Sequence, residues 1–364
     1  MSESLQKENE VNKSPCSEVG PPPPLTSFTT ANAGFYVLSG CSQPLIMTLC
    51  KNAGIADPRC QLYMVFYYLG PASVIFSFIG RQQQVHWPSS RTILKGCGIA
   101  LFDIAATAMN YTGASLAGPT IFAIVYSSVT VWTALFSLLF LGRFMNGWQW
   151  TSVIIVFGGL TLTASDSLQL GDAVANGLVL VTIGSAMHAL TYVMSEGIMT
   201  GSDERLSVRQ NCAVQGIVAC SCFLLWQLIY TIPRFYERIL VPMRATETNG
   251  VHAFGILLLF GFANLVHATT FFHTLRHFPG GATSAGVMKG LQAVLVFVFT
   301  HIAYCGRTGS EEMCFTRAKF LSLVTVVGGV VGYGVATQER ERRIAGYERI
   351  ESEANVEVVN SASY

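Results

Sequence analysis

The chain has 364 residues, of which 51% are hydrophobic and 12% charged, and its formal net charge at pH 7 is +1. Soluble domains carry about 25% charged residues, so this composition argues against a soluble protein and favours one embedded in a membrane. The near-neutral charge, without zinc-finger spacing or an RNA-binding signature, gives no support for nucleic-acid binding.

The first 29 residues are polar and include four consecutive prolines from Pro21 to Pro24. They lack the basic and then apolar pattern of a cleaved signal peptide. We expect residues 1–29 to form a disordered cytosolic segment and the first apolar span to act as an uncleaved signal.

Apolar segments long enough to cross a bilayer, about 20 residues each, recur between Thr30 and Thr337. Each must be helical, because lipid offers no partner to an unpaired backbone N–H or C=O group. The sequence therefore predicts an all-α polytopic membrane protein of about ten transmembrane helices. The expected spans are 30–50, 60–79, 94–112, 119–141, 150–164, 177–195, 211–232, 253–275, 282–304 and 320–337.

Lysine and arginine are more numerous in the segments that share a side with the N-terminus, and such loops are cytosolic by the positive-inside rule. The loop after the fifth span fits this orientation, because it holds Asp166 and Asp172 and no basic residue. The basic loop after the seventh span opposes it. We predict that both termini are cytosolic and that residues 338–364 form a charged, disordered tail.

The two halves of the apolar region share features that indicate a duplication. Short turns follow the third, fourth and eighth spans, and a Gly-Gly pair occurs at 158–159 in the fifth span and at 328–329 in the tenth. Coincidence is the alternative, since glycine is common in membrane helices. Residues 30–164 and 165–337 are predicted to be five-helix repeats, and an odd number of spans inverts one repeat relative to the other, as in many transporters.

The stretch 105–164 carries a family resemblance. A Tyr-Thr-x-Ala-Ser turn at 111–115 precedes a span that ends in Leu-Phe-Leu-Gly-Arg at 139–143, and Gln149-Trp150 opens a span that contains Gly-Gly. This stretch resembles the drug/metabolite transporter (EamA-like) superfamily, and within it the nucleotide-sugar transporters of solute carrier family thirty-five. The resemblance implies a ten-helix inverted-repeat fold. The run Gly-Val-Met-Lys-Gly at 286–290 holds the lysine of the family's ninth span without its usual asparagine.

Polar residues inside the predicted spans are candidates for solute binding. Inserting an ionisable side chain costs roughly 2.5–3.5 kcal/mol, so such a residue usually has a partner or a task. Lys289 offers an ammonium group to a phosphate or carboxylate; a structural ion pair or snorkelling to the interface is the alternative. Hydroxyl side chains also join membrane helices to one another. The predicted solute-binding residues are Lys289, Gln292, Ser127, Tyr126, Thr130 and Asn264.

Three further residues are candidates for ion or proton coupling. Asp103 lies in the third span. Its predicted roles are pairing with Lys289, binding of a cation or uptake of a proton, and the alternative is a hydrogen bond that packs helices. His188 and His267 lie on polar stripes of the sixth and eighth spans and titrate near neutral pH; the alternative for each is a packing role. Arg143, at the end of the fourth span, is interpreted as a positive-inside anchor.

Ten cysteines are scattered along the chain. The pairs Cys50–Cys60 and Cys305–Cys314 border loops on the predicted non-cytosolic side, so both are candidate disulfides. The other cysteines are expected to be small buried residues. No motif indicates a metal site, a cofactor or a catalytic residue.

Without an ATP-binding P-loop, transport is expected to proceed by exchange or ion coupling. The leading hypothesis is a secondary transporter that exchanges a small polar, anionic solute such as a nucleotide sugar or a related metabolite. One alternative is a proton-coupled exporter of amines or drug-like compounds, and another is a receptor or scaffold that transports nothing. The sequence lacks Gly-x-Ser-x-Gly and His-Glu-x-x-His, which argues against a membrane hydrolase.

Two features predict partners and location. Tyr347 and Ile350 fit a Tyr-x-x-apolar signal read by sorting adaptors, which favours a Golgi or endolysosomal membrane over the plasma membrane. Gly328 and Gly332 form a Gly-x-x-x-Gly pair suited to close helix packing, within one chain or in a homodimer. The small solute and the lipid bilayer complete the predicted partners.

Overall fold

The structure is a computed structural model that describes residues 26–79, 86–117, 122, 125–161, 172–201, 204–306, 314 and 316–361, and these residues form helices and turns without a strand. In chain order the helices are α2 (Ser27–Asn52), α3 (Leu62–Ala72) with the 3₁₀ turn η1 (Ser73–Phe78), α4 (Ser90–Ala117), α6 (Val129–Leu141), α7 (Gly147–Thr161), α8 (Asp172–Thr200), α9 (Val208–Trp226) with the extension η2 (Gln227–Thr231), η3 (Ile232–Arg234) and η4 (Tyr236–Leu240), α10 (Val241–Ala245), α11 (Gly250–His277), α12 (Gly281–Tyr304) and α13 (Arg317–Ser361).

The all-α, polytopic class predicted from composition is confirmed. Among the described residues, seven helices are long and apolar enough to cross a membrane, and Leu62–Phe78 and Val129–Leu141 are shorter apolar helices. Each expected span coincides with helix over most of its described length. The first part of the fourth span lies outside the described residues apart from Phe122. The total of ten transmembrane helices stays a prediction.

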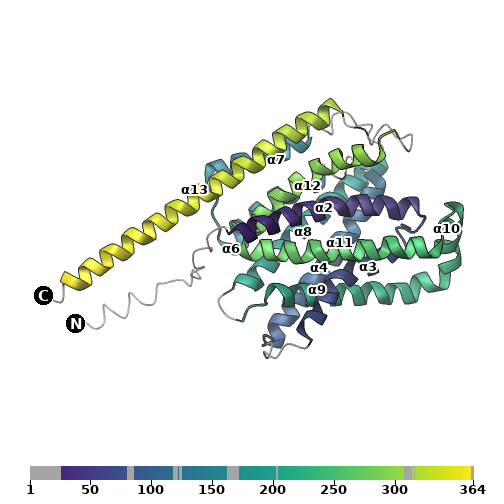
Figure 1. Cartoon of the computed structure of the whole chain (residues 1–364), viewed down its shortest axis with the longest axis horizontal. Coiled ribbons are helices and arrows are strands. Elements are labelled where there is room, and N and C mark those ends of the chain that lie inside the picture. The colour runs from purple at the N-terminus through teal and green to yellow at the C-terminus, as the bar shows by residue number, and fades with distance from the viewer. Residues whose placement is uncertain are drawn as a thin grey trace.

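Successive long helices run in alternating directions, which defines two ends of the bundle. We call the end where α2 begins the N-side and the opposite end the far side. The Asn32 side-chain amide of α2 donates a hydrogen bond to the Thr270 carbonyl of α11 at 3.0 Å, so the start of α2 lies beside the last turns of α11. Figure 1 shows α10 at the far side, at the other end of α11.

Helix α3 packs tightly between α9 and α11 because glycines allow close approach. A Cβ added at Gly70 would overlap the carbonyl oxygen of Gly261, and a Cβ at Gly216 would overlap the backbone nitrogen of Ala72. A Cβ at Gly261 would lie 2.7 Å from the Phe66 carbonyl oxygen. Small residues give membrane helices this kind of contact, since lipid provides no hydrophobic drive for helix association.

The pairing of helices has the order expected of an inverted repeat. Helix α4 packs on α8, and α11, its counterpart in the second half, packs on α2, the counterpart of α8. An inverted repeat relates its two halves by a pseudo-two-fold axis, which exchanges each helix with its counterpart. Three such counterpart pairs contact each other: α3 with α9, α6 with α12, and α7 with α13. Figure 1 shows α7 and α13 side by side at the edge of the bundle. The division at residue 164 stays a prediction.

Gly332 of α13 faces α7, where a Cβ would lie 3.1 Å from the Ser152 Oγ. A Cβ at Gly328 would meet no atom within 4 Å. The two glycines predicted to form one Gly-x-x-x-Gly contact therefore differ in this structure: Gly332 packs within the chain, and Gly328 lies at an open surface. A homodimer stays a prediction.

The C-terminal tail differs from the expected disorder, because α13 continues without interruption to Ser361 and extends beyond the bundle (Figure 1). The tail is rich in the helix formers Ala, Glu and Arg and contains no proline, so nothing terminates the helix that the last span starts. Arg343 Nη2 also lies 2.6 Å from Glu339 Oε1 in an i,i+4 ion pair, an arrangement that supports exposed helix. Tyr347 and Ile350 lie in this extension.

Of three apolar clusters, one joins α7, α12 and α13, and the other two lie on either side of the mid-height of the bundle. The far-side cluster joins α2, α3, α9 and α11 through buried residues that include Cys50, Tyr63 and Phe260. The N-side cluster joins α2, α8, α11 and α12 through residues that include Ala189 and Ala285. The polar side chains between these clusters form the candidate site.

Candidate functional site

The ionisable residues predicted from the sequence lie near mid-height in the bundle. Lys289 is eight residues from the N-side start of α12 at Gly281, which is about 12 Å at 1.5 Å per residue. His267 is ten residues from the N-side end of α11 at His277, about 15 Å along the axis. The hydrocarbon core of a bilayer is about 30 Å thick, so both residues lie too deep to reach an interface easily.

Lys289 begins a directed chain of hydrogen bonds. Its Nζ lies 3.1 Å from His267 Nε2, and an ammonium group only donates, so Nε2 accepts and the ring proton is assigned to Nδ1. Nδ1 then donates to Ser39 Oγ at 3.2 Å. The Ser39 hydroxyl donates to the Tyr36 carbonyl oxygen at 3.1 Å. Each hydrogen bond in the chain has one donor and one acceptor when Lys289 is charged and His267 is neutral, and the ammonium group keeps further donors for a ligand.

Among the described residues, Lys289 makes no ion pair within 4 Å. Besides His267, its nearest stabilising neighbour is the ring of Tyr36, whose centroid lies 5.6 Å from Nζ. A cation over an aromatic face gains about 0.5–2 kcal/mol, which is less than the several kcal/mol that desolvation of an ion costs. Lys289 therefore has no anionic group in direct contact among the described residues, and a ligand would supply one.

A second polar cluster surrounds His188 of α8. His188 Nε2 lies 3.4 Å from Asp103 Oδ1 and 3.2 Å from Thr107 Oγ1, both on α4. The Tyr68 hydroxyl of α3 donates to the other Asp103 oxygen, Oδ2, at 2.7 Å. Asp103 retains 26% of its side-chain exposure and His188 13%, so neither group is sealed off. This carboxylate and imidazole pair can exchange a proton.

Asn110 lies on the other edge of the His188 ring. Its Nδ2 is 3.2 Å from His188 Nδ1, while its buried Oδ1 has no hydrogen-bond partner among the described residues. Rotation of the Asn110 side-chain amide by half a turn would bring its Oδ1 to His188 Nδ1 as an acceptor. The amide oxygen and nitrogen are nearly indistinguishable in size. Asn110 can thus pair with either the neutral or the doubly protonated imidazole.

Aromatic rings connect the two polar clusters. The Tyr126 hydroxyl lies 3.2 Å from His188 Nδ1 and 3.5 Å from the Tyr192 hydroxyl. The Tyr192 ring contacts Phe271 edge-on at 4.6 Å between centroids, and Phe271 lies 5.6 Å from Tyr36. The lysine cluster and the aspartate cluster therefore share one layer of the bundle.

Other predicted solute-binding residues use their polar groups in helix packing. Gln292 donates to the Tyr36 carbonyl at 2.9 Å, and Thr130 donates to the Gly286 carbonyl at 2.8 Å. Asn264 donates to the backbone of α3 at 2.7 Å and accepts from Gln43 at 2.9 Å. Ser127 is also buried. Their contact with a solute stays a prediction.

Tyr36 and Tyr68 belong to the site, and sequence reasoning missed both. A signal for Tyr36 was present: Tyr-Val-Leu-Ser at 36–39 in α2 matches Tyr-Val-Met-Ser at 192–195 in α8. These helices would be counterparts in an inverted repeat, and both tyrosines are buried in the N-side cluster. No comparable pattern marks Tyr68, whose role depends on the packing of α3 against α4.

A buried ion pair closes the N-side of the site. The Glu196 side chain in α8 is 2% exposed, and its Oε1 accepts from Arg143 Nη2 at 2.6 Å. Glu196 Oε2 accepts from the backbone N–H of Ala282, in the first turn of α12, at 2.6 Å. A Cβ at Gly281 would overlap this carboxylate. Arg143 thus does more than the positive-inside anchoring predicted for it, because it links the end of α6 to α8 and α12.

A surface carboxylate ties two more N-side ends together. The backbone N–H of Ser89, just before α4, donates to Glu204 Oε2 at 2.6 Å. Glu204 lies in the connection between α8 and α9. Hydrogen bonds from the Ser89 side chain and backbone lower the pKa of this carboxyl. The contact is therefore ionised at neutral pH and weakens only as the medium becomes acidic enough to protonate Glu204.

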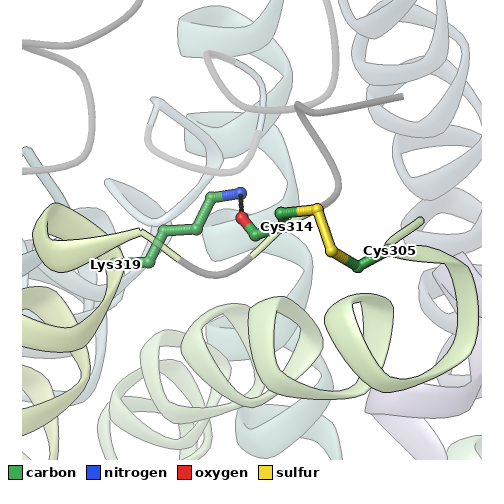
Figure 2. The surroundings of a disulfide bond; sticks show 3 residues. All are labelled: Cys305, Cys314 and Lys319. Carbon is green, nitrogen blue, oxygen red and sulfur yellow. Dashed lines mark hydrogen bonds between the residues drawn. A yellow bond between two sulfur atoms is a disulfide. The ribbon is translucent and has the colours of Figure 1, made fainter. Parts of the chain in front are cut away.

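Of the two candidate disulfides, the structure contains one. Cys305 and Cys314 are joined, with their Cα atoms 4.8 Å apart, and Figure 2 shows Lys319 Nζ donating to the Cys314 carbonyl at 2.7 Å. Cys50 and Cys60 are free, buried thiols, so their predicted bond is absent. Both pack in the far-side apolar cluster, where sequence spacing alone does not determine which way each thiol points.

Two cavities in the described part of the chain are lined by neither Lys289 nor Asp103. One, of about 510 Å³, is lined by α4, α9 and the loop before α3. The other, of about 140 Å³, lies between α12 and α13. The N-side and far-side apolar clusters lie on either side of the polar layer in this conformation, while Asp103 and His188 keep part of their side-chain exposure.

Comparisons with known proteins agree with this architecture. A solved crystal structure of a protein superposes with a TM-score of 0.64 at 14% sequence identity, covering 87% of this chain and 100% of that one. At that identity the likeness shows the fold alone. No curated protein matches the chain. Residues 46–165 match the model of the EamA-like transporter family. The first half of this polytopic membrane protein therefore carries an EamA-like domain, which indicates a membrane transporter of small solutes.

Proposed function

We propose that this protein is a secondary transporter that binds the anionic group of a small polar solute at Lys289 and moves it by exchange. The observation that carries the proposal is an ammonium group at mid-height in the bundle, with an imidazole at 3.1 Å and no carboxylate within 4 Å among the described residues. A phosphate or carboxylate of the solute would complete this pair.

Alternating access is supported by the layers around the polar site. The N-side cluster and the Arg143–Glu196 pair cover it on one side, and the far-side cluster covers it on the other. Opening either side requires separation of a different set of helices, as in transporters that rock two repeats around a fixed site. The tyrosine-rich polar layer, with Tyr36, Tyr126 and Tyr192, suits a solute that also presents an aromatic or sugar face.

The orientation and the membrane are part of the proposal. The Cys305–Cys314 disulfide lies at the far side, in the connection between α12 and α13. Disulfides persist where the environment is oxidising, so we place the far side in a lumen or outside the cell and both termini in the cytosol. An endomembrane location and an adaptor that reads Tyr347 and Ile350 remain part of the same proposal.

The test is a thermal-unfolding panel on purified protein with nucleotide sugars, nucleoside monophosphates, phosphorylated sugars, amino acids and organic amines. A ligand at 100 times its Kd stabilises the folded protein by about 2.7 kcal/mol. Loss of a charge-assisted contact of about 1.5–3 kcal/mol would weaken binding roughly 10- to 150-fold. At the same ligand concentration, Lys289→Ala should then be stabilised by only about 0.3–1.3 kcal/mol.

The matched control is Lys95→Ala, which removes an exposed lysine from the N-side end of α4. This variant should respond to the ligand like the wild type. A phosphorylated or carboxylated compound that stabilises the wild type and Lys95→Ala but not Lys289→Ala would identify the substrate class. If Lys289→Ala responds like the wild type, Lys289 has a structural role and the proposal is wrong.

The Asp103–His188 pair favours a second candidate, the proton-coupled export of amines. A carboxylate bonded to both Tyr68 and His188 can bind a cationic solute or a proton in alternation. In that case only amines would be active in the panel, and the response would depend on Asp103 rather than Lys289.

A further inference from the structure

The larger cavity, of about 510 Å³, lies in the far-side half of the bundle and belongs to neither polar cluster. Its walls are apolar or small side chains of α4 and α9, namely Ile104, Ala108, Cys222 and Phe223. Its mouth is formed by Arg59, in the loop between α2 and α3, and by Trp226 and Tyr230 at the end of α9. The cavity therefore combines a long apolar wall with one cationic end.

This cavity faces the lipid rather than the centre of the protein. Leu101 and Phe102, beside it on α4, are 55% and 45% exposed, and Leu224 and Leu225, beside it on α9, are 48% and 57% exposed. On helices that cross a membrane such side chains contact hydrocarbon. Cys222, in the cavity wall, is itself exposed. The groove between α4 and α9 is therefore open to an acyl chain from the bilayer.

The mouth has the composition of a membrane interface. The Trp226 indole nitrogen donates to the Arg59 carbonyl oxygen at 2.9 Å, and the Trp226 and Tyr230 rings stack at 5.0 Å. Arg234 lies over the Tyr230 ring at 4.6 Å. Tryptophan and tyrosine concentrate at the depth of lipid headgroups. These contacts place the Arg59 backbone at the level where a lipid phosphate would lie.

Arg59 has a free charge at this mouth. The neighbouring carboxylate of Asp57 pairs with Arg238 at 3.6 Å, and Arg59 makes no ion pair in the described part of the chain. A guanidinium group matches the geometry of phosphate oxygens and binds them in a bidentate manner. An apolar groove that ends at an unpaired guanidinium complements one kind of molecule, a phosphate attached to long acyl chains.

We propose that the groove between α4 and α9 is a phospholipid site, with an acyl chain along Ile104, Ala108 and Phe223 and the phosphate at Arg59. The site is connected to the polar layer. The Phe223 ring stacks on Tyr68 at 5.5 Å with 13° between planes, and Tyr68 donates to Asp103 at 2.7 Å. A bound lipid would thus support the wall that holds Asp103 in place.

The test uses the full chain in detergent after removal of co-purified lipid. Phosphatidylglycerol, diacylglycerol with the same acyl chains, and glycerol phosphate are added separately, and thermal unfolding and lipid retention in native mass spectra are measured. We expect phosphatidylglycerol to be retained and to stabilise the protein, and the other two to do neither. Retention of diacylglycerol at equal concentration would show that binding does not need the phosphate. Stabilisation by glycerol phosphate would show that binding does not need the acyl chain in the groove. Either result overturns the proposal.

Two variants locate the lipid. Arg59→Gln leaves the backbone carbonyl that Trp226 contacts and should weaken phosphatidylglycerol binding about tenfold or more, since the lost contact is charge-assisted. Ala108→Trp fills the groove and should abolish retention. Their controls are Lys51→Gln, an exposed cation on the same side, and Leu225→Trp, an exposed position on the same helix as Phe223. Wild-type retention by Arg59→Gln would overturn the proposal even if Ala108→Trp does not fold.

Discussion

Glu196→Gln tests whether the Arg143–Glu196 pair holds the N-side closed. The substitution removes the negative charge and preserves the shape of a side chain that is 2% exposed. The carboxylate now accepts two hydrogen bonds of 2.6 Å, from Arg143 Nη2 and from the backbone N–H of Ala282. Glutamine has a single acceptor oxygen, so it can satisfy only one of these donors well.

The size of the effect follows from these two contacts. The charge-assisted bond to Arg143 contributes about 1.5–3 kcal/mol. The hydrogen bond from Ala282 would have a neutral acceptor in place of a charged one. Its strength would decrease by about 1 kcal/mol, since charge-assisted hydrogen bonds are roughly twice as strong as neutral ones. In an open state water would solvate either side chain. The closed state should therefore lose about 2.5–4 kcal/mol relative to the open one, which raises the open population about 60- to 700-fold.

The assay is the labelling rate of Ala285→Cys by a membrane-impermeant maleimide, with the labelled peptide identified by mass spectrometry. Ala285 is fully buried in the N-side cluster behind the ion pair, so the reagent reaches it only when that side opens. Where closing is faster than labelling, the rate is proportional to the open population. In the Glu196→Gln background the rate should rise by the calculated factor.

Two controls make the result specific. Glu339→Gln changes the same residue type in a pair with the same 2.6 Å separation, but that pair is exposed on α13, so the labelling of position 285 should not change. Cys50, buried in the far-side cluster, reports general loosening. The reasoning is refuted if Glu196→Gln leaves the labelling rate unchanged, or if Cys50 becomes reactive to the same extent.

Two further predictions concern the proton and the thiols. In proteoliposomes, Asp103→Asn should abolish accumulation of the solute driven by a pH gradient and leave its exchange intact, because an amide removes the carboxylate that faces His188 at 3.4 Å and would stabilise its protonated ring; accumulation that persists in the variant would contradict this. Peptide mapping under non-reducing conditions should recover Cys305 and Cys314 as one linked species and Cys50 and Cys60 as separately alkylated thiols. A Cys50–Cys60 crosslink would show that the far-side cluster is packed differently.

The sequence identifies the ionisable residues inside the apolar spans but not the partners that they contact in the structure. Lys289, Asp103, His188 and His267 stand out because charge is rare in apolar spans, and the structure brings them into one layer. Their contacts depend on how each helix is rotated and how deep it lies, which local periodicity does not determine. Pairs such as Arg143 with Glu196, 53 residues apart, become visible only when the helices are packed.

The same limit explains the cysteines and the tail. Spacing allowed both candidate disulfides, but a bond needs side chains that point toward each other, and Cys50 and Cys60 pack with apolar neighbours instead. The tail was predicted to be disordered from its charge. In that segment the high charge favours disorder, whereas the helix propensity of the residues favours a helix. The i,i+4 ion pair between Glu339 and Arg343 forms only when the segment is helical.

The donor and acceptor pattern also distinguishes the two histidines that the sequence treated alike. His267 accepts from Lys289 through Nε2, so a second proton on this ring would remove the acceptor and place two cations 3.1 Å apart. His188 faces Asp103 through Nε2, and its Nδ1 faces an amide that can rotate to accept. A doubly protonated His188 ring would face the Asp103 carboxylate with Nε2 and the oxygen of the rotated Asn110 amide with Nδ1. We infer that His188 carries the proton in any coupled cycle, and that His267 serves to orient Lys289 toward the solute.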